Sequence, residues 1–196
     1  MEIGTLTKVT ARHADEVLPL AQAAGQNLPP GDGATPAAFL EQLISRSAFD
    51  EAVQFLAFAL PKREAVWWAC LCARSDLRDP VPAPALAALT AAEAWVYRPT
   101  EENRRAAMER AQETKFDTSS AWAAVAAFWS GGSLAPPDLP AVTPAAHLSG
   151  AAVAGAVTLA AVQTEPELAD EKRQRYIKIA IDIANGGSGR IEAKGS

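Results

Sequence analysis

The sequence has few of the residues from which metal sites and nucleophilic active sites are usually built. Its 196 residues include two cysteines and two histidines. Cys70 and Cys72 stand two positions apart, about 200° around a helix, so they cannot act together as metal ligands on one face. His13 and His147 have no Gly-x-Ser-x-Gly motif and no Cys/His arrangement nearby. We therefore expect no catalytic residues, no metal ion and no cofactor.

Clustered positive charge and strongly apolar runs are also missing. The chain has 18 Lys and Arg against 23 Asp and Glu, which gives a net charge of −5. A nucleic-acid surface needs grouped basic residues, and the densest run, 171–175, is short and has acids just upstream. Residues 144–162 carry no charge, but small residues dominate them and insert weakly into a bilayer. The first residues lack the features of a secretory signal. We expect a cytoplasmic protein without nucleic-acid or membrane partners.

What the sequence does have is alanine, with 44 of 196 residues. Alanine is the best helix former and is poor in strands, so the fold class is predicted to be all-α. Apolar spacing and capping residues predict eight or nine helices, arranged as an irregular stack or bundle of antiparallel hairpins. Expected helices cover residues 11–24, 36–44, 50–60, 61–74, 84–97, 121–129, 144–163 and 167–184, and a further helix follows Thr100 and includes residues 101–109. Thr35, Asp50, Thr100 and Ser119–Ser120 stand at helix starts.

One of these helices is ambiguous. Between residues 176 and 183 the isoleucines alternate with other residues, which is a strand pattern. Lys178, Asp182 and Asn185 nevertheless fall on one stripe at helical spacing. We predict a helix, because the neighbouring segments are helical and only residues 5–10 could offer a partner strand.

The expected domain organisation is one helical domain over residues 1–186. A proline-rich segment, 134–143, could be an arm packed on the surface or a hinge between sub-lobes 1–133 and 144–186. The glycine-rich tail, 187–196, is predicted to be disordered.

Residues 59–70, ALPKREAVWWAC, form the most informative stretch. Adjacent helix positions point about 100° apart, so one tryptophan could enter the core while the other lies at its boundary beside an arginine. Tryptophan and arginine dominate the energetics of protein interfaces. The alternative is that both rings are core, one with its indole N–H bonded to a carbonyl, and that the charges are structural ion pairs. The candidate partner-binding residues are Arg63, Glu64, Trp67, Trp68 and Arg74.

Three passages carry a resemblance to a family. They are residues 59–70, residues 121–133 (AWAAVAAFWSGGS) and residues 181–187 (IDIANGG), together with the helix around 153–157. With them the chain resembles an uncharacterised bacterial domain-of-unknown-function family of similar length, whose members are often encoded near type VI secretion genes for spike, PAAR-like and effector-adaptor proteins. The family has no assigned catalytic residues, so none is carried over.

We therefore expect a non-catalytic protein-interaction module. The resemblance implies an adaptor or chaperone whose partner is a secreted effector, a spike or a PAAR-like component. A first alternative is an immunity protein that neutralises a cognate toxin, in keeping with the acidic net charge. A second is an enzyme with an unrecognised site, which would need a deep polar pocket holding a perturbed carboxylate.

Overall fold

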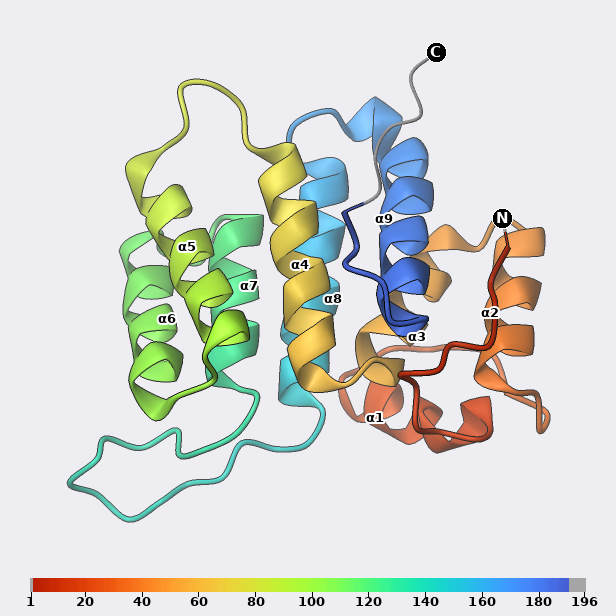
Figure 1. Ribbon diagram of the computed structural model, residues 1–196, viewed down its shortest axis with the longest axis horizontal. Coiled ribbons are helices and arrows are strands. Elements are labelled where there is room, and N and C mark those ends of the chain that lie inside the picture. Colours follow the sequence, from red (N-terminus) through yellow and green to blue (C-terminus); the bar gives the residue numbers. More distant parts are fainter. Residues whose placement is uncertain (1, 191–196) are drawn as a thin grey trace.

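The computed structural model describes residues 2–190 and consists of helices joined by turns and loops (Figure 1). Over these residues the chain forms nine α-helices and two short 3-10 helices, with no β-strand, so the all-α prediction is confirmed. Segment 176–183 is helical, as predicted. In chain order the elements are η1 (Ala14–Glu16), α1 (Leu18–Ala23), α2 (Pro36–Ser45), α3 (Phe49–Ala59), α4 (Lys62–Asp76), α5 (Ala83–Tyr97), α6 (Glu101–Glu113), α7 (Ser119–Phe128), α8 (Leu148–Val162), η2 (Pro166–Leu168) and α9 (Ala169–Ala184).

Helix α8 is the centre of the packing. It contacts α7, α4, α3 and α9, while α5 and α6 pack beside α7 on one side and α2 packs on α3 on the other (Figure 1). Helices from before and after segment 134–143 therefore share one core, which is a single cluster of buried apolar residues. The hinge interpretation of segment 134–143 is wrong, because α8 is embedded between helices that precede it.

Small side chains allow this close approach. Ala152, Ala156 and Ala160 of α8 are completely buried. At Gly150 an added Cβ would collide with the ring of Phe58 on α3. The uncharged composition of this segment thus serves close helix packing, and no helix in the described part of the chain combines the length and apolarity needed to cross a membrane.

Two predicted helix caps are confirmed and two are displaced. The hydroxyls of Thr35 and Thr100 accept backbone N–H groups at the starts of α2 and α6. Asp50 instead lies in the first turn of α3, because Ser47 adopts a left-handed φ of 59° and ends α2 so tightly that α3 begins at Phe49. Helix α7 is capped by Thr118, directly before the two predicted serines.

The predicted first and eighth helices are shorter than expected. Residues 11–24 divide into η1 and α1, because Pro19 has no N–H to continue a helix through this stretch and instead stands in the first turn of α1. Residues 144–147 form a turn, and α8 begins at Leu148.

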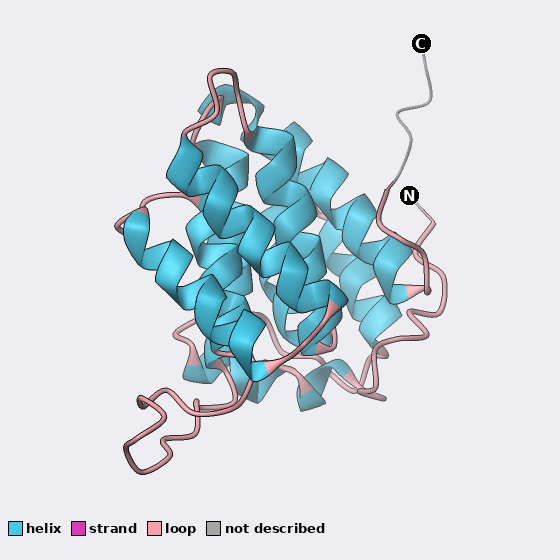
Figure 2. Ribbon diagram, turned by 60° about the vertical axis from the view of Figure 1, so that its left-hand side comes forward, coloured by secondary structure: helices cyan, strands magenta, loops and turns pink. Residues whose placement is uncertain are grey.

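The proline-rich segment projects from the helical body as a loop (Figures 1 and 2). Its base is closed by the Leu134 N–H, which donates to the Val142 carbonyl at 2.8 Å. The Ser133 hydroxyl accepts the Val142 N–H at 3.0 Å. Leu139 and Val142 are exposed, so this arm is not packed on the surface along its length.

The glycine-rich tail is ordered over residues 187–190, which corrects the prediction of disorder. Figure 1 shows this dark-blue segment running back between α4 and α9. Gly189 is buried there, against Leu71 of α4 and Ile183 of α9. The rest of the predicted tail, 191–196, lies outside the described residues.

Candidate functional site

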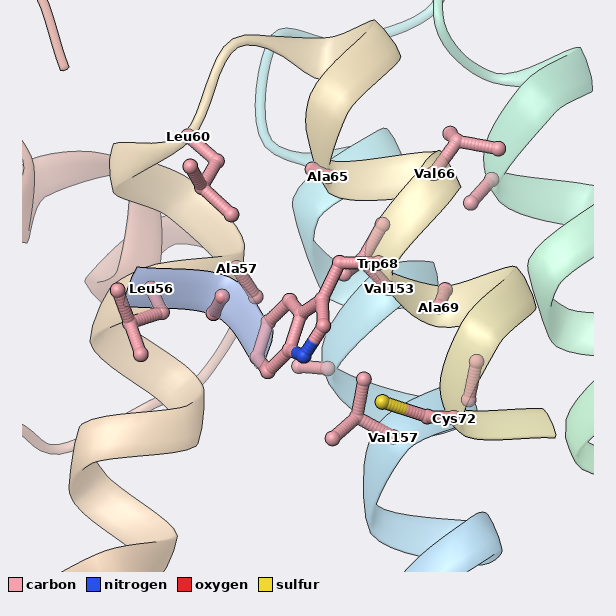
Figure 3. Packing of buried hydrophobic residues seen from close by; sticks show 14 of the residues in the cluster. Leu56, Ala57, Leu60, Ala65, Val66, Trp68, Ala69, Cys72, Val153 and Val157 are labelled. Carbon is pink, nitrogen blue, oxygen red and sulfur yellow. The ribbon is translucent and has the colours of Figure 1, made fainter. Parts of the chain in front are cut away.

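Trp68 is a core residue. It is 0% exposed, and its ring points from α4 towards Leu56 and Ala57 of α3 and towards Val153 of α8 (Figure 3). Its indole N–H donates to the carbonyl of Tyr176 at 2.8 Å. Trp68 therefore cannot touch a partner, and its assignment to the partner-binding set is wrong.

Trp67 lies at the boundary, as the 100° offset between neighbours predicts. Its ring packs 5.8 Å from the ring of Tyr97, which is 63% exposed. The indole N–H of Trp67 donates to the carbonyl of Ser188 at 2.8 Å, and the guanidinium of Arg190 lies 5.5 Å from the ring centre. The surface predicted around Trp67 exists, but the chain itself covers part of it.

The three charged candidates all have partners within the chain. Arg63 donates to the carbonyls of Val96 and Tyr97 and so satisfies the end of α5. Glu64 pairs with Lys8 at 3.4 Å.

Arg74 makes a two-pronged ion pair with Glu93 of α5, at 2.8 and 2.6 Å. Glu93 raises the pKa of Arg74 above its usual value. On α4, Arg74 lies about 16 Å along the axis from Arg63, so the structure does not unite the two in one site.

A second aromatic surface, which the sequence analysis did not single out, lies between α7 and α8. It is a groove of about 570 Å³ and is mainly apolar. Trp122 and Trp129 line it together as a contacting pair, next to Ala151, Ala154 and Gly155 of α8. We call it the Trp122/Trp129 groove; its lining comprises Gln26, Gln54, Trp122, Trp129, Ala151, Ala154, Gly155, Thr158 and Leu159.

The two rings of this groove hold a defined geometry. Their centres lie 6.2 Å apart at 69°, an edge-to-face pair. The indole N–H of Trp122 donates to the carbonyl of Phe116 at 3.0 Å, which fixes its orientation. Gly155 faces Trp122 with room to spare, since an added Cβ would stand 3.9 Å from the ring. The Trp122 ring therefore lies beside Gly155 at ordinary contact distance, in an orientation fixed by its hydrogen bond.

A buried polar atom borders the groove. The amide oxygen of Gln54, on α3, is buried, and no donor in the described part of the chain lies within hydrogen-bond distance of it. A buried acceptor without a partner costs about 1–3 kcal/mol.

The sequence did contain a signal for this groove. Trp122 and Trp129 are seven positions apart, about two helical turns, and so fall on the same side of α7. Seven-residue spacing of this kind is shared by core residues, and only the packing of α8 shows that these rings border a groove.

An enzyme would need a polar pocket that holds a perturbed carboxylate. The feature most similar to this in the described part of the chain is a buried ion pair beside a cavity. Lys172 and Asp76 have side chains 5% exposed and lie 3.1 Å apart. The Thr164 hydroxyl donates to Asp76 and accepts a hydrogen bond from Lys172. A cavity of about 310 Å³, lined in part by Ser119 and Ser120, adjoins Asp76. Asp76 and Lys172 satisfy one another and join the end of α4 to α9.

Both cysteines are free thiols enclosed in the core. Burial raises the pKa of both the Cys70 and Cys72 thiols, which keeps them protonated. Among residues 2–190, no group of three or more His, Cys, Asp and Glu side chains is arranged to hold a metal ion.

Comparison with known protein families shows to which family the chain belongs. The model of a family of unknown function, DUF6931, matches residues 39–184. The chain belongs to the DUF6931 family. The DUF6931 match runs from within α2 to the end of α9, so it includes the Trp122/Trp129 groove and the α4 surface around Trp67. No curated protein and no solved structure matches the chain. The expected membership of an uncharacterised family is confirmed, and the match itself assigns no activity.

Proposed function

We propose that this protein is a non-catalytic protein-interaction module that docks its partner in the Trp122/Trp129 groove. The main support is the groove itself, a mainly apolar space of about 570 Å³ lined by two tryptophans that pack edge to face. Large aromatic side chains beside an apolar floor are the usual anchors of protein interfaces.

The shape of the groove suits an amphipathic helix as the docked element. Its floor follows the helix α8 at Ala151, Ala154, Gly155 and Thr158, so the small residues form a row along the helix axis. Helices bind in such grooves through apolar side chains at i, i+3 and i+4.

The proposed biological role is that of a cytoplasmic adaptor or chaperone for a type VI secretion effector, spike or PAAR-like component. This role rests on the family resemblance of the tryptophan-containing passages. An immunity protein is the alternative, and the two differ in one assay, because only an immunity protein rescues cells that express the cognate toxin.

The experiment that tests docking is co-purification from the source bacterium with variants of Gly155. Gly155→Ala should keep the partner, because the added methyl group only reaches ordinary contact with Trp122. Gly155→Arg should fill the groove and abolish recovery of the partner while leaving the melting temperature close to that of Gly155→Ala.

A matched control is Leu86→Ala, which removes an exposed apolar side chain outside the groove and should leave co-purification unchanged. Equal recovery of the same partner by Gly155→Arg and the parent protein would show that docking does not use the groove.

A further inference from the structure

We propose that the surface around Trp67, between α4 and α9, is a peptide-binding groove that the chain's own residues Ser188–Arg190 fill, and that its ligand is an extended partner segment carrying a glycine followed by an arginine. This surface is separate from the Trp122/Trp129 groove, so the failure of either proposal leaves the other standing.

The contacts made by this segment are those by which proteins bind extended peptides. Two involve only its main chain: the Trp67 indole N–H donates to the Ser188 carbonyl at 2.8 Å, and the Gly189 N–H donates to an Asp182 carboxylate oxygen at 2.8 Å. Such main-chain hydrogen bonds give affinity without regard to sequence, and pockets for individual side chains give specificity.

Two positions of the segment, Gly189 and Arg190, have surroundings that select a residue type. At Gly189 the backbone has a left-handed φ of 73°, and a Cβ would stand 2.6 Å from Leu71 and 2.8 Å from Ile183. Only glycine fits. The next residue, Arg190, lies 5.5 Å from the centre of the Trp67 ring and donates to the Tyr97 hydroxyl at 3.2 Å. A planar guanidinium over an indole ring is a favourable contact, so the surface formed by Trp67 and Tyr97 selects arginine.

The groove is only partly filled. Beside the segment lies an open cavity of about 180 Å³, whose apolar lining is Trp67, Val96 and Ile183 and whose charged lining is Lys8, Arg63 and Glu64. The chain's own residues here are Gly186 and Gly187, which have no side chains to place in it.

The chain's own segment follows α9 directly and cannot place a side chain in this cavity. A partner segment has no such connection to α9 and can fill it. Gly186 is held at a φ of 92°, a conformation that side chains rarely adopt, by the turn that ends that helix. A lysine in the equivalent position of a partner could lay its stem on Val96 and Ile183 and share the Glu64 carboxylate with Lys8. These contacts would favour the partner over the tethered segment, whose effective concentration is about millimolar.

The segment differs from the helix before it in exposure and in lacking helical hydrogen bonds. Ser188 and Arg190 are exposed, and the segment has no regular secondary structure. Few buried apolar contacts are typical of parts of a protein that open without global unfolding.

The first test uses a chain that ends at Gly186 and a fluorescein-labelled peptide of residues 186–190. The shortened chain should bind the peptide, and the full chain should bind it at least about tenfold more weakly because its own segment competes. A Gly189→Val peptide should lose binding, and a Gly186→Lys peptide should bind several-fold more tightly. A shortened chain that melts like the parent and binds no peptide at about 1 mM overturns the proposal, as does equal binding by both chains.

A second test does not depend on the shortened chain folding. In the full chain, hydrogen exchange of the Gly189 amide reports on release of the segment, because this amide is bonded to Asp182. We expect it to exchange at least about a hundredfold faster than the amides of Ala180 and Ile181 in α9. Exchange as slow as these core amides would mean that the segment is a permanent part of the fold, which overturns the proposal.

Discussion

Trp68 and Tyr176 are joined at the centre of the core by a hydrogen bond of 2.8 Å from the indole N–H to the backbone carbonyl. Both side chains are completely buried. The bond ties α4 to α9, two helices more than a hundred positions apart in the sequence, and it explains how a polar indole group is accommodated among apolar neighbours.

Replacing this tryptophan should destabilise the protein far more than replacing its neighbour. Trp68→Ala removes a fully buried ring and the second of two hydrogen bonds to the Tyr176 carbonyl, which also accepts the helical N–H of Ala180, and should cost about 3–5 kcal/mol. Trp67→Ala, at the boundary, should cost about 1 kcal/mol. Urea denaturation followed by circular dichroism measures both. Equal losses would contradict the core and boundary assignments.

Two glycines of α8 should respond in opposite directions to alanine. Gly150→Ala places a methyl group against the Phe58 ring and the Ala57 carbonyl, and should destabilise by about 1–3 kcal/mol. Gly155→Ala meets only ordinary contact and should stabilise by about 0.5–1 kcal/mol, because alanine loses less backbone entropy in a helix. Each variant is the control for the other, and thermal melting of the pair is sufficient. A stable Gly150→Ala variant would contradict the close approach of α3 and α8.

The buried ion pair of Asp76 and Lys172 should behave as a unit. Lys172→Met leaves a buried carboxylate with only Thr164 as partner and should cost about 3–5 kcal/mol. The double variant Asp76→Leu, Lys172→Met removes both charges and should recover most of this loss. Urea denaturation of the two single variants and the double variant gives the coupling energy. Strict additivity of the single losses would show that the two charges do not depend on one another.

The two cysteines should make the protein sensitive to alkaline pH. Burial raises the pKa of each thiol in the folded state, so their contribution to stability is fully present below the unfolded-state pKa of about 8.5. Above that pH the unfolded chain loses protons that the folded chain retains, and each thiol should lower the free energy of unfolding by about 1.4 kcal/mol per pH unit. Replacing both cysteines with alanine should flatten this dependence between pH 8.5 and 10. In the same range, the native thiols should react with a thiol reagent only after denaturant is added.

Local chemistry in the sequence determined the helical content and several helix starts. Alanine favours helix wherever it stands, and the hydroxyls of Thr35 and Thr100 cap the residues that follow them directly in the chain. The helical state of residues 176–183 could likewise be predicted, since the polar residues there keep one stripe at helical spacing.

Tertiary packing alone decided which surfaces remain available for binding. The sequence placed Trp67 and Trp68 on different sides of a helix, but only the positions of α3, α8 and α9 show that Trp68 is enclosed. The Trp122/Trp129 groove exists because α8 presents small residues next to α7, a relation between segments that a helical pattern does not encode. Tertiary contacts also fix the conformation of residues 187–190. A glycine-rich stretch has no local preference for one conformation, and the contacts of Gly189 with Leu71 select one.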